Sequence, residues 1–153
     1  MNVEAINIGP SDAIAPVGSV RAVAGKGLEG DRYFDEGGTF SDNRRTNGRD
    51  ITLIEAEAVE GLARDTGIEL SQAETRRNVV TRGVALNDLV GRRFAVGEIE
   101  CVGRRLCDPC SHLQKLTQGG VLKGLVDRGG LRADIVRGGV IRPGDALTEL
   151  PAA

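Results

Sequence analysis

The segment Cys107-Asp108-Pro109-Cys110-Ser111-His112 combines two thiols and the single imidazole of the chain in one short stretch. It lies where an alternating strand pattern gives way to a helical pattern. A thiol at the start of a helix experiences the positive end of the helix dipole, which favours the nucleophilic thiolate. Arg104 and Arg105 would act in the same direction, whereas Asp108 would oppose them. We therefore expect an activated cysteine here, the alternative being two buried, inert cysteines beside a turn.

The spacing of the two thiols is also that of zinc sites and of dithiol redox centres. Cys101, Cys107, Cys110 and His112 could together supply four zinc ligands. However, Cys101 falls in an alternating strand pattern and no second C-x-x-C follows, so we expect no zinc. A dithiol redox role lacks its usual β-α-β context. His112 is two residues after Cys110, and such residues point apart on a helix, so it either contacts substrate or only caps a helix or faces solvent.

Arginine dominates the basic residues, because only Lys26, Lys115 and Lys123 are lysines among 20 basic residues. Glycine is also abundant, with 22 residues. Arginine recognises carboxylates and phosphates through its planar, forked set of donors. Both excesses have a second explanation in the base composition of the genome. The positions of the arginines must therefore decide between the two.

The first arginine of interest follows a glycine-rich turn, in the pair Asp31-Arg32 after Gly27-Leu28-Glu29-Gly30. The segment is neither a P-loop nor a dinucleotide-binding fingerprint, because the residues that must follow are absent. A charged pair at a tight turn can present a guanidinium to an anion. The alternative is that the glycines only connect two strands.

Two further arginine positions stand beside predicted strands. In Arg76-Arg77-Asn78, strand alternation would place Arg76 and Asn78 on one face and Arg77 on the other. A guanidinium and an amide together suit phosphate or a pterin-like heterocycle, although both arginines could simply be solvated. Arg132 follows Gly129-Gly130, and paired glycines either let a backbone approach an anion or merely form a turn.

The elements that must position these residues are mostly short strands. The sequence predicts seven or eight of them, with two or three inserted helices. One helix is expected from Ile54 to a stop at Gly67, a helical turn at the Ser71–Glu74 capping box, and another helix after Cys110. Residues 35–50 are expected to form an exposed loop. The clearest strands are predicted at residues 3–8, 20–24, 51–54, 78–81, 93–96, 98–102 and 132–137, and residues 146–150 close the chain. We expect a mainly β (α+β) chain folded as a small β-barrel, with residues 1–153 as one domain.

The overall composition excludes several classes of protein. The net charge is −2 and the aromatic residues are one tyrosine and three phenylalanines, so nucleic-acid binding is not expected. Apolar runs are too short to cross a membrane. The first residues lack the pattern of a secretion signal, so we expect a cytoplasmic protein with reduced thiols.

Six segments in this order resemble the MOSC domain, the C-terminal domain of molybdenum-cofactor sulfurases, which also occurs as a small standalone protein. The resemblance covers about residues 22–150. Its segments are GKGLEGDRY (25–33), ETRRNVV (74–80), LNDLVGRRFAVGEIE (86–100), CDPCSHL (107–113), RGGLRADIV (128–136) and GGVIRPGD (138–145).

The resemblance implies a barrel-like fold of the pyruvate-kinase β-barrel type and one functional cysteine. The Pro109-Cys110 pair matches the family's cysteine position, so Cys110 is identified as the residue that carries persulfide sulfur or contacts molybdenum. Cys107 is an extra thiol that could resolve a persulfide. Many family members have a histidine where this chain has Tyr33. The residues matching positions that approach the cofactor in molybdenum-binding members are Asp31, Arg32, Arg76 and Asn78.

From these features we expect a molybdenum-cofactor-associated protein with Arg132 as a further cofactor-binding residue and Arg77, Cys107 and His112 as accessory residues. If Cys110 ligates molybdenum, the protein would reduce N-hydroxylated compounds with an electron-transfer partner. If it carries sulfur without redox catalysis, a cysteine desulfurase or other donor must supply the sulfur. The family is also linked to pyridoxal phosphate, but the chain has no recognisable segment for it. The remaining alternative is a non-catalytic module for a small anionic ligand.

Overall fold

The computed structural model describes residues 1–9, 14–31, 34, 48, 50–71, 73–106 and 128–151. Eleven strands and one α-helix make up this part of the chain, together with two short 3₁₀ helices. The strands are β1 (Asn2–Ile8), β2 (Ala15–Val17), β3 (Val20–Val23), β4 (Gly27–Leu28), β5 (Ile51–Glu55), β6 (Val79–Arg82), β7 (Arg93–Val96), β8 (Ile99–Leu106), β9 (Leu131–Arg137), β10 (Gly139–Ile141) and β11 (Leu147–Glu149). The helices are α3 (Ala56–Thr66), η1 (Ala73–Thr75) and η2 (Leu86–Leu89).

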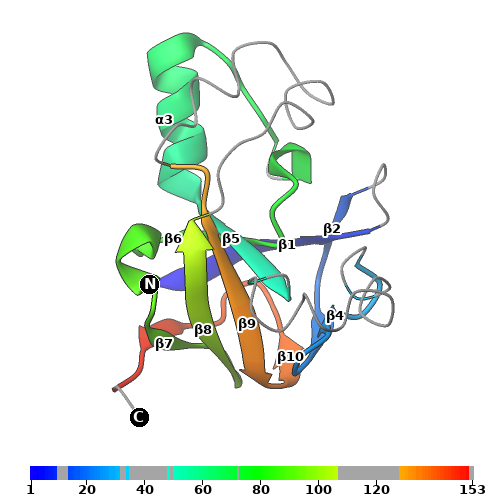
Figure 1. Ribbon diagram of the computed structural model, residues 1–153. Coiled ribbons are helices and arrows are strands. Elements are labelled where there is room, and N and C mark those ends of the chain that lie inside the picture. The colour runs from blue at the N-terminus through cyan, green and yellow to red at the C-terminus, as the bar shows by residue number, and fades with distance from the viewer. Residues whose placement is uncertain are drawn as a thin grey trace.

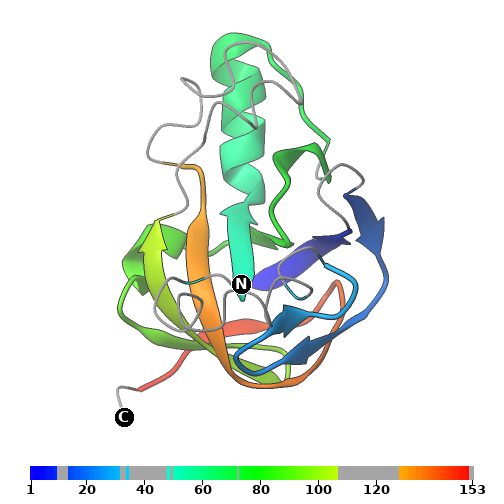
Figure 2. The same cartoon turned by 45° about the vertical axis from the view of Figure 1, so that its right-hand side comes forward.

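The strands form two sheets. The larger has the order β11-β7-β8-β9-β5-β6-β1-β2, and the smaller has the order β10-β3-β4. All pairs are antiparallel except β5 and β6, which run parallel because α3 connects them. Helix α3 continues directly from β5 and projects from one end of the large sheet, while β3, β4 and β10 lie at the other end (Figure 1; Figure 2).

The main hydrophobic core lies on one face of the large sheet, which we call the inner face. Ile51 and Leu53 on β5 and Leu131 on β9 are completely buried there. Because side chains alternate along a strand, these residues share one face and leave the residues between them on the opposite, outer face. Phe94 is the largest side chain buried in this core.

The helical signals in the sequence correspond to observed caps. Gly67 ends α3 in the left-handed conformation (φ 78°), and its N–H donates to the carbonyl of Ala63. The predicted capping box is confirmed, since the Ser71 N–H donates to Glu74 Oε1 (2.8 Å) and the Glu74 N–H donates to Ser71 Oγ (3.2 Å). The helix expected after Cys110 and most of the loop expected at residues 35–50 lie outside the described residues.

The prediction of a mainly β chain is confirmed, but the small closed barrel is not. Among the described residues no ladder of paired strands joins β1 to β11, so the large sheet keeps two edges. An isolated bridge between Asn2 and Ala146 and a hydrogen bond from the Val3 N–H to the Asp145 carbonyl bring these strands near each other. β11 has only three residues and already pairs with β7, so it is too short to form a second ladder with β1 that would close a barrel.

More strands are present than the sequence predicted. β4 occupies a segment predicted as a turn, and β2, at one edge of the large sheet, lies outside the predicted strands. Leu28 explains the first difference, because its side chain is fully buried in the main core and fixes a two-residue pairing with β3. None of the helices in the described part of the chain is long and apolar enough to cross a membrane.

Candidate functional site

The outer face of the large sheet changes from apolar to polar along its central strands. At the end nearest α3, the side chains of Ala5, Ile54 and Val80 form a small apolar cluster with Ala56 and Ala58 of the helix. Two residues from Ala5 and Ile54 along their strands, and therefore on the same face, lie Asn7 and Thr52. Asn78 lies directly before β6 and is hydrogen-bonded to the side chain of Thr52. These three polar side chains are buried, with relative exposures of 0%, 1% and 0%. We call them, together with Arg132 and Asp134, the polar face.

Asn78 connects three strands within the polar face. Its Oδ1 accepts hydrogen bonds from the Thr52 N–H (3.0 Å) and the Thr52 hydroxyl (3.2 Å), and its Nδ2 donates to the Asn7 carbonyl (3.2 Å). Its own N–H donates to Thr52 Oγ1 (3.0 Å). Since both polar atoms of the side chain are engaged by β1 and β5, Asn78 acts as a brace that sets the positions of its neighbours.

Arg132 and Asp134 extend the polar face onto β9. Thr52 and Arg132 are directly paired across β5 and β9, so their side chains leave the sheet on the same side. Asp134 is two residues further along β9 and 6% exposed. Its Oδ2 accepts a hydrogen bond from Arg104 Nε of β8 at 2.7 Å. Arg104 thereby joins the polar face from the neighbouring strand.

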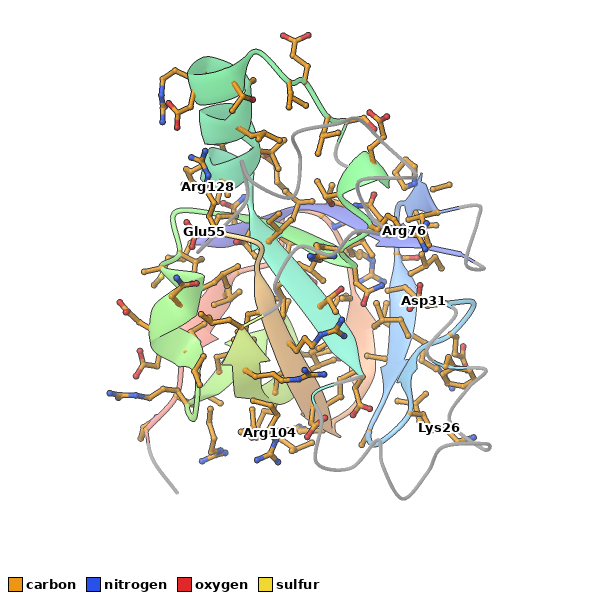
Figure 3. All side chains as sticks on the ribbon, turned by 45° about the horizontal axis from the view of Figure 1, so that its top comes forward. Lys26, Asp31, Glu55, Arg76, Arg104 and Arg128 are labelled. Atoms are coloured by element: carbon orange, nitrogen blue, oxygen red, sulfur yellow. The ribbon has the colours of Figure 1, made fainter. Side chains whose placement is uncertain are left out.

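Asp31 lies at the opposite border of the polar face. Its carboxylate is fully buried and accepts a hydrogen bond from the Gly9 N–H, directly after β1, at 3.3 Å. Arg76 lies on the same side of β5 as Asp31, whereas Arg104 lies on the other side (Figure 3). The polar face and Arg104 thus extend across five adjacent strands, from β8 through β9, β5 and β6 to β1, and Asp31 and Arg76 lie outside these strands.

The predicted strand alternation at Arg76-Arg77-Asn78 is wrong. β6 begins only at Val79, and Arg76 has a left-handed backbone (φ 59°). Arg77 is 7% exposed, and its Nε donates to the Gly129 carbonyl at 2.9 Å. This bond holds the segment that enters β9, so Arg77 has a structural role in addition to its predicted accessory one.

Of the three cysteines, the structure describes Cys101. It is fully buried in the main core, and burial raises the pKa of its thiol, an effect that the nearby carboxylates of Asp50 and Asp134 strengthen. Cys101 is therefore an inert core residue rather than a reactive thiol. Four predicted site residues lie outside the described residues: Arg32, Cys107, Cys110 and His112.

Among the described residues, no group of three or more His, Cys, Asp or Glu side chains could hold a metal ion.

The sequence pointed to neither Thr52 nor Asp134 as a site residue, and it indicated Arg104 only as one of several arginines near the segment of Cys110. The two-residue spacing of Arg132 and Asp134 on a predicted strand indicates that they share a face, because side chains alternate along a strand. The pairing of Asp134 with Arg104 had no such signal, because 30 residues separate them.

A separate cavity of about 420 Å³ lies between α3 and the segment that follows it. It contains none of the predicted site residues. Its lining residues are Val59, Glu60, Ala63, Glu69, Leu70 and Ser71.

Comparison with known proteins identifies the family of this chain. The family model of the MOSC domain matches residues 40–148. The chain belongs to the MOSC domain family. This family is linked to the molybdenum cofactor. No match was found among curated proteins.

Solved structures show the same fold as this MOSC domain at low sequence identity. The YuaD protein from Bacillus subtilis is 17% identical, with a TM-score of 0.77, covering 95% of this chain and 92% of its own. YiiM from Geobacillus stearothermophilus is 16% identical (TM-score 0.71), covering 98% of this chain and 75% of its own. YiiM from Escherichia coli is 15% identical (TM-score 0.72), covering 100% of this chain and 71% of its own.

Proposed function

We propose that this MOSC domain is a molybdenum-cofactor-associated protein in which Cys110 ligates molybdenum or carries sulfur as a persulfide. The observation that carries the proposal is the course of β8. This strand passes the polar face at Arg104 and ends at Leu106, directly before the segment that contains Cys107 and Cys110. Arg104 and the cysteine that the family resemblance identifies thus belong to one continuous stretch of a chain whose family is linked to the molybdenum cofactor.

The donors of the polar face suit an anionic group such as a phosphorylated pterin. Arg104 and Arg132 would hold its anionic part, because guanidinium groups form charge-assisted hydrogen bonds to oxyanions. Arg76 would lie at the other side of the same ligand and Asp31 would border it. Asn78 would act through Thr52, since its side-chain atoms are already engaged. The cofactor, when bound, would supply a metal centre for two-electron chemistry.

As a sulfur carrier, Cys110 would accept sulfur from a donor persulfide. The thiolate attacks the terminal sulfur of the donor, the donor S–S bond breaks, and a Cys110 persulfide and a donor thiol result. No net electrons are exchanged with the surroundings. A cysteine desulfurase or another sulfur donor is the partner that this step requires. Cys107 could later attack the inner sulfur of the Cys110 persulfide, which breaks its S–S bond, releases hydrosulfide and leaves a Cys107–Cys110 disulfide.

As a reductase, the protein would convert an N-hydroxylated compound to the amine. This reaction consumes two electrons and two protons and releases one water molecule. An electron-transfer partner must supply the electrons, because the sequence contains no recognisable flavin or iron–sulfur motif.

One preparation tests both forms of the proposal. The protein is purified from a host that makes molybdenum cofactor, and molybdenum, pterin and cyanolysable sulfur are measured in the wild type, in Cys110→Ser and in the control Cys107→Ser. Molybdenum and pterin that are lost in Cys110→Ser support ligation, and sulfur without molybdenum supports the carrier. If neither is found in a folded wild-type protein, the remaining function is a non-catalytic module for an anionic ligand.

A further inference from the structure

Arg104 occupies an unusual position in the large sheet. The register between β8 and β9 shifts between Gly103 and Arg105, so Arg104 is the extra residue of a β-bulge. Bulges redirect side chains and are frequent beside functional sites. Here the bulge directs Arg104 towards Asp134 on β9, where its Nε donates to the carboxylate at 2.7 Å.

Asp134 holds the guanidinium of Arg104 firmly. The side chain of Asp134 is 8% exposed, whereas that of Arg104 is 42% exposed. In the part of the chain that the structure describes, Arg104 is the only side chain that pairs with this carboxylate, and Asp134 Oδ1 has no hydrogen-bond donor. A buried carboxylate depends strongly on its one counter-ion, so the orientation of Arg104 is restricted.

The bond to Asp134 uses only the Nε edge of the guanidinium. No described residue pairs with the two Nη atoms of Arg104, which can therefore donate to a ligand. An arginine whose Nε is fixed and whose Nη atoms are accessible presents preoriented donors to an oxyanion.

A second arginine lies beside the first. A Cβ atom built on Gly48 would lie 3.0 Å from Arg104 Cβ and 3.0 Å from Arg132 Cβ. The stems of the two arginines therefore flank one point and are at most twice that distance apart. Arginine side chains are long enough for both guanidinium groups to reach one ligand above these stems. Gly48 itself has a left-handed backbone (φ 64°), which suits its position between them.

We propose that Arg104, oriented by Asp134 and assisted by Arg132, binds a tetrahedral oxyanion, specifically the phosphate group of a ligand. The proposal deepens the proposed function by assigning a phosphate group to the two arginines and a positioning role to Asp134, and for the identity of the ligand it rests on the proposed function. Arg104 and Arg132 are the binding residues. Asp134 is a positioning residue that acts through Arg104.

The test measures binding of inorganic phosphate to the full chain by calorimetry at constant ionic strength, with chloride as the balancing anion. Arg104→Gln should weaken binding about tenfold or more, because a charge-assisted hydrogen bond is lost. Arg104→Lys should weaken it less, since it keeps the charge but loses the forked donors. Asp134→Asn should give an intermediate loss, and sulfate should compete with phosphate.

Arg92→Gln is the matched control, because the guanidinium of Arg92 forms an exposed ion pair with Glu149 of β11, a strand that β7 separates from β8. It should bind phosphate like the wild type. Unchanged affinity in Arg104→Gln and Arg104→Lys would overturn the proposal and leave a purely structural ion pair, as would a wild type that does not bind phosphate. If Arg104→Gln does not fold, the phosphate affinity of Arg104→Lys tests the proposal in its place. Cys110→Ser should bind phosphate normally, so failure of the sulfur and molybdenum tests can be distinguished from failure of this site.

Discussion

The two faces of β5 and β6 are equally buried but chemically opposite. On the inner face, Ile51, Leu53 and Val79 are completely excluded from solvent, and so are the polar Thr52 and Asn78 on the outer face, to within 1%. Apolar burial stabilises a sheet with no requirement for exact partners. Buried polar groups contribute little net stability and each needs a hydrogen-bond partner, so they fix positions instead. The inner face therefore stabilises the fold, and the outer face holds polar side chains in fixed positions where a ligand could bind.

Truncation of the inner face should have the largest effect. Leu53→Ala should lower the free energy of unfolding by about 2–5 kcal/mol, because a fully buried leucine is replaced by a cavity. Denaturant unfolding followed by circular dichroism measures this loss. Arg132→Ala on the outer face is the comparison variant, and an equal loss in both would contradict the division between the faces.

Removal of the brace on the polar face should have the next largest effect. Asn78→Ala leaves the Thr52 N–H and hydroxyl without their acceptor, and we expect a loss of about 1–3 kcal/mol. Unfolding in urea measures it. Thr52→Val keeps the volume and removes one hydroxyl, so it should cost less than Asn78→Ala. If Asn78→Ala lowers the free energy of unfolding by less than Thr52→Val does, Asn78 does not connect the strands.

The buried Cys101 of the inner face should also differ in thiol chemistry from Cys110. Cys101 faces the main core and its raised pKa keeps it protonated, so iodoacetamide should modify it only after unfolding, whereas Cys110 should react at neutral pH. Mass spectrometry of peptides after timed labelling distinguishes the two sites. Equal, slow labelling of all three cysteines would argue against an activated Cys110.

The same thiol makes stability depend on pH. The pKa of Cys101 is higher in the folded than in the unfolded protein, so its contribution to stability is complete below the unfolded pKa of about 8.5 and is lost as the pH rises towards the folded pKa. Melting temperatures measured between pH 7 and about pH 10 should therefore fall more steeply in the wild type than in Cys101→Val. Identical slopes would show that this thiol stays protonated in both states.

The smallest predicted effect lies at the border between β5 and α3. Partial burial raises the pKa of Glu55, although its carboxylate accepts a hydrogen bond from the Leu86 N–H. Because the folded pKa is raised, this group favours folding below its unfolded pKa of about 4.3 and opposes it as the pH rises through the folded value. Glu55→Gln should make melting slightly less dependent on pH between 4 and 7. A larger slope in the variant would contradict this sign.

The sequence predicted much of the local structure correctly. Alternation located most strands, and Gly67 and the Ser71–Glu74 pair located helical caps, because these signals act over a few residues. The family resemblance also came from short segments in order. The same local reasoning failed at Arg76, where a left-handed residue interrupts the assumed strand, and at Leu28, where burial makes a strand from an expected turn.

Thus the sequence by itself determined the mainly β character, the positions of the caps, the membership of the MOSC family and the set of arginines from which a site could be built. Only the tertiary structure decided which of these arginines share a face. Pairing of Arg104 with Asp134 and bracing of Thr52 by Asn78 depend on the order and register of strands that are distant in the chain. Long-range pairing of this kind leaves no periodic signal, because it depends on which strands become neighbours rather than on the residues next to each other in the sequence.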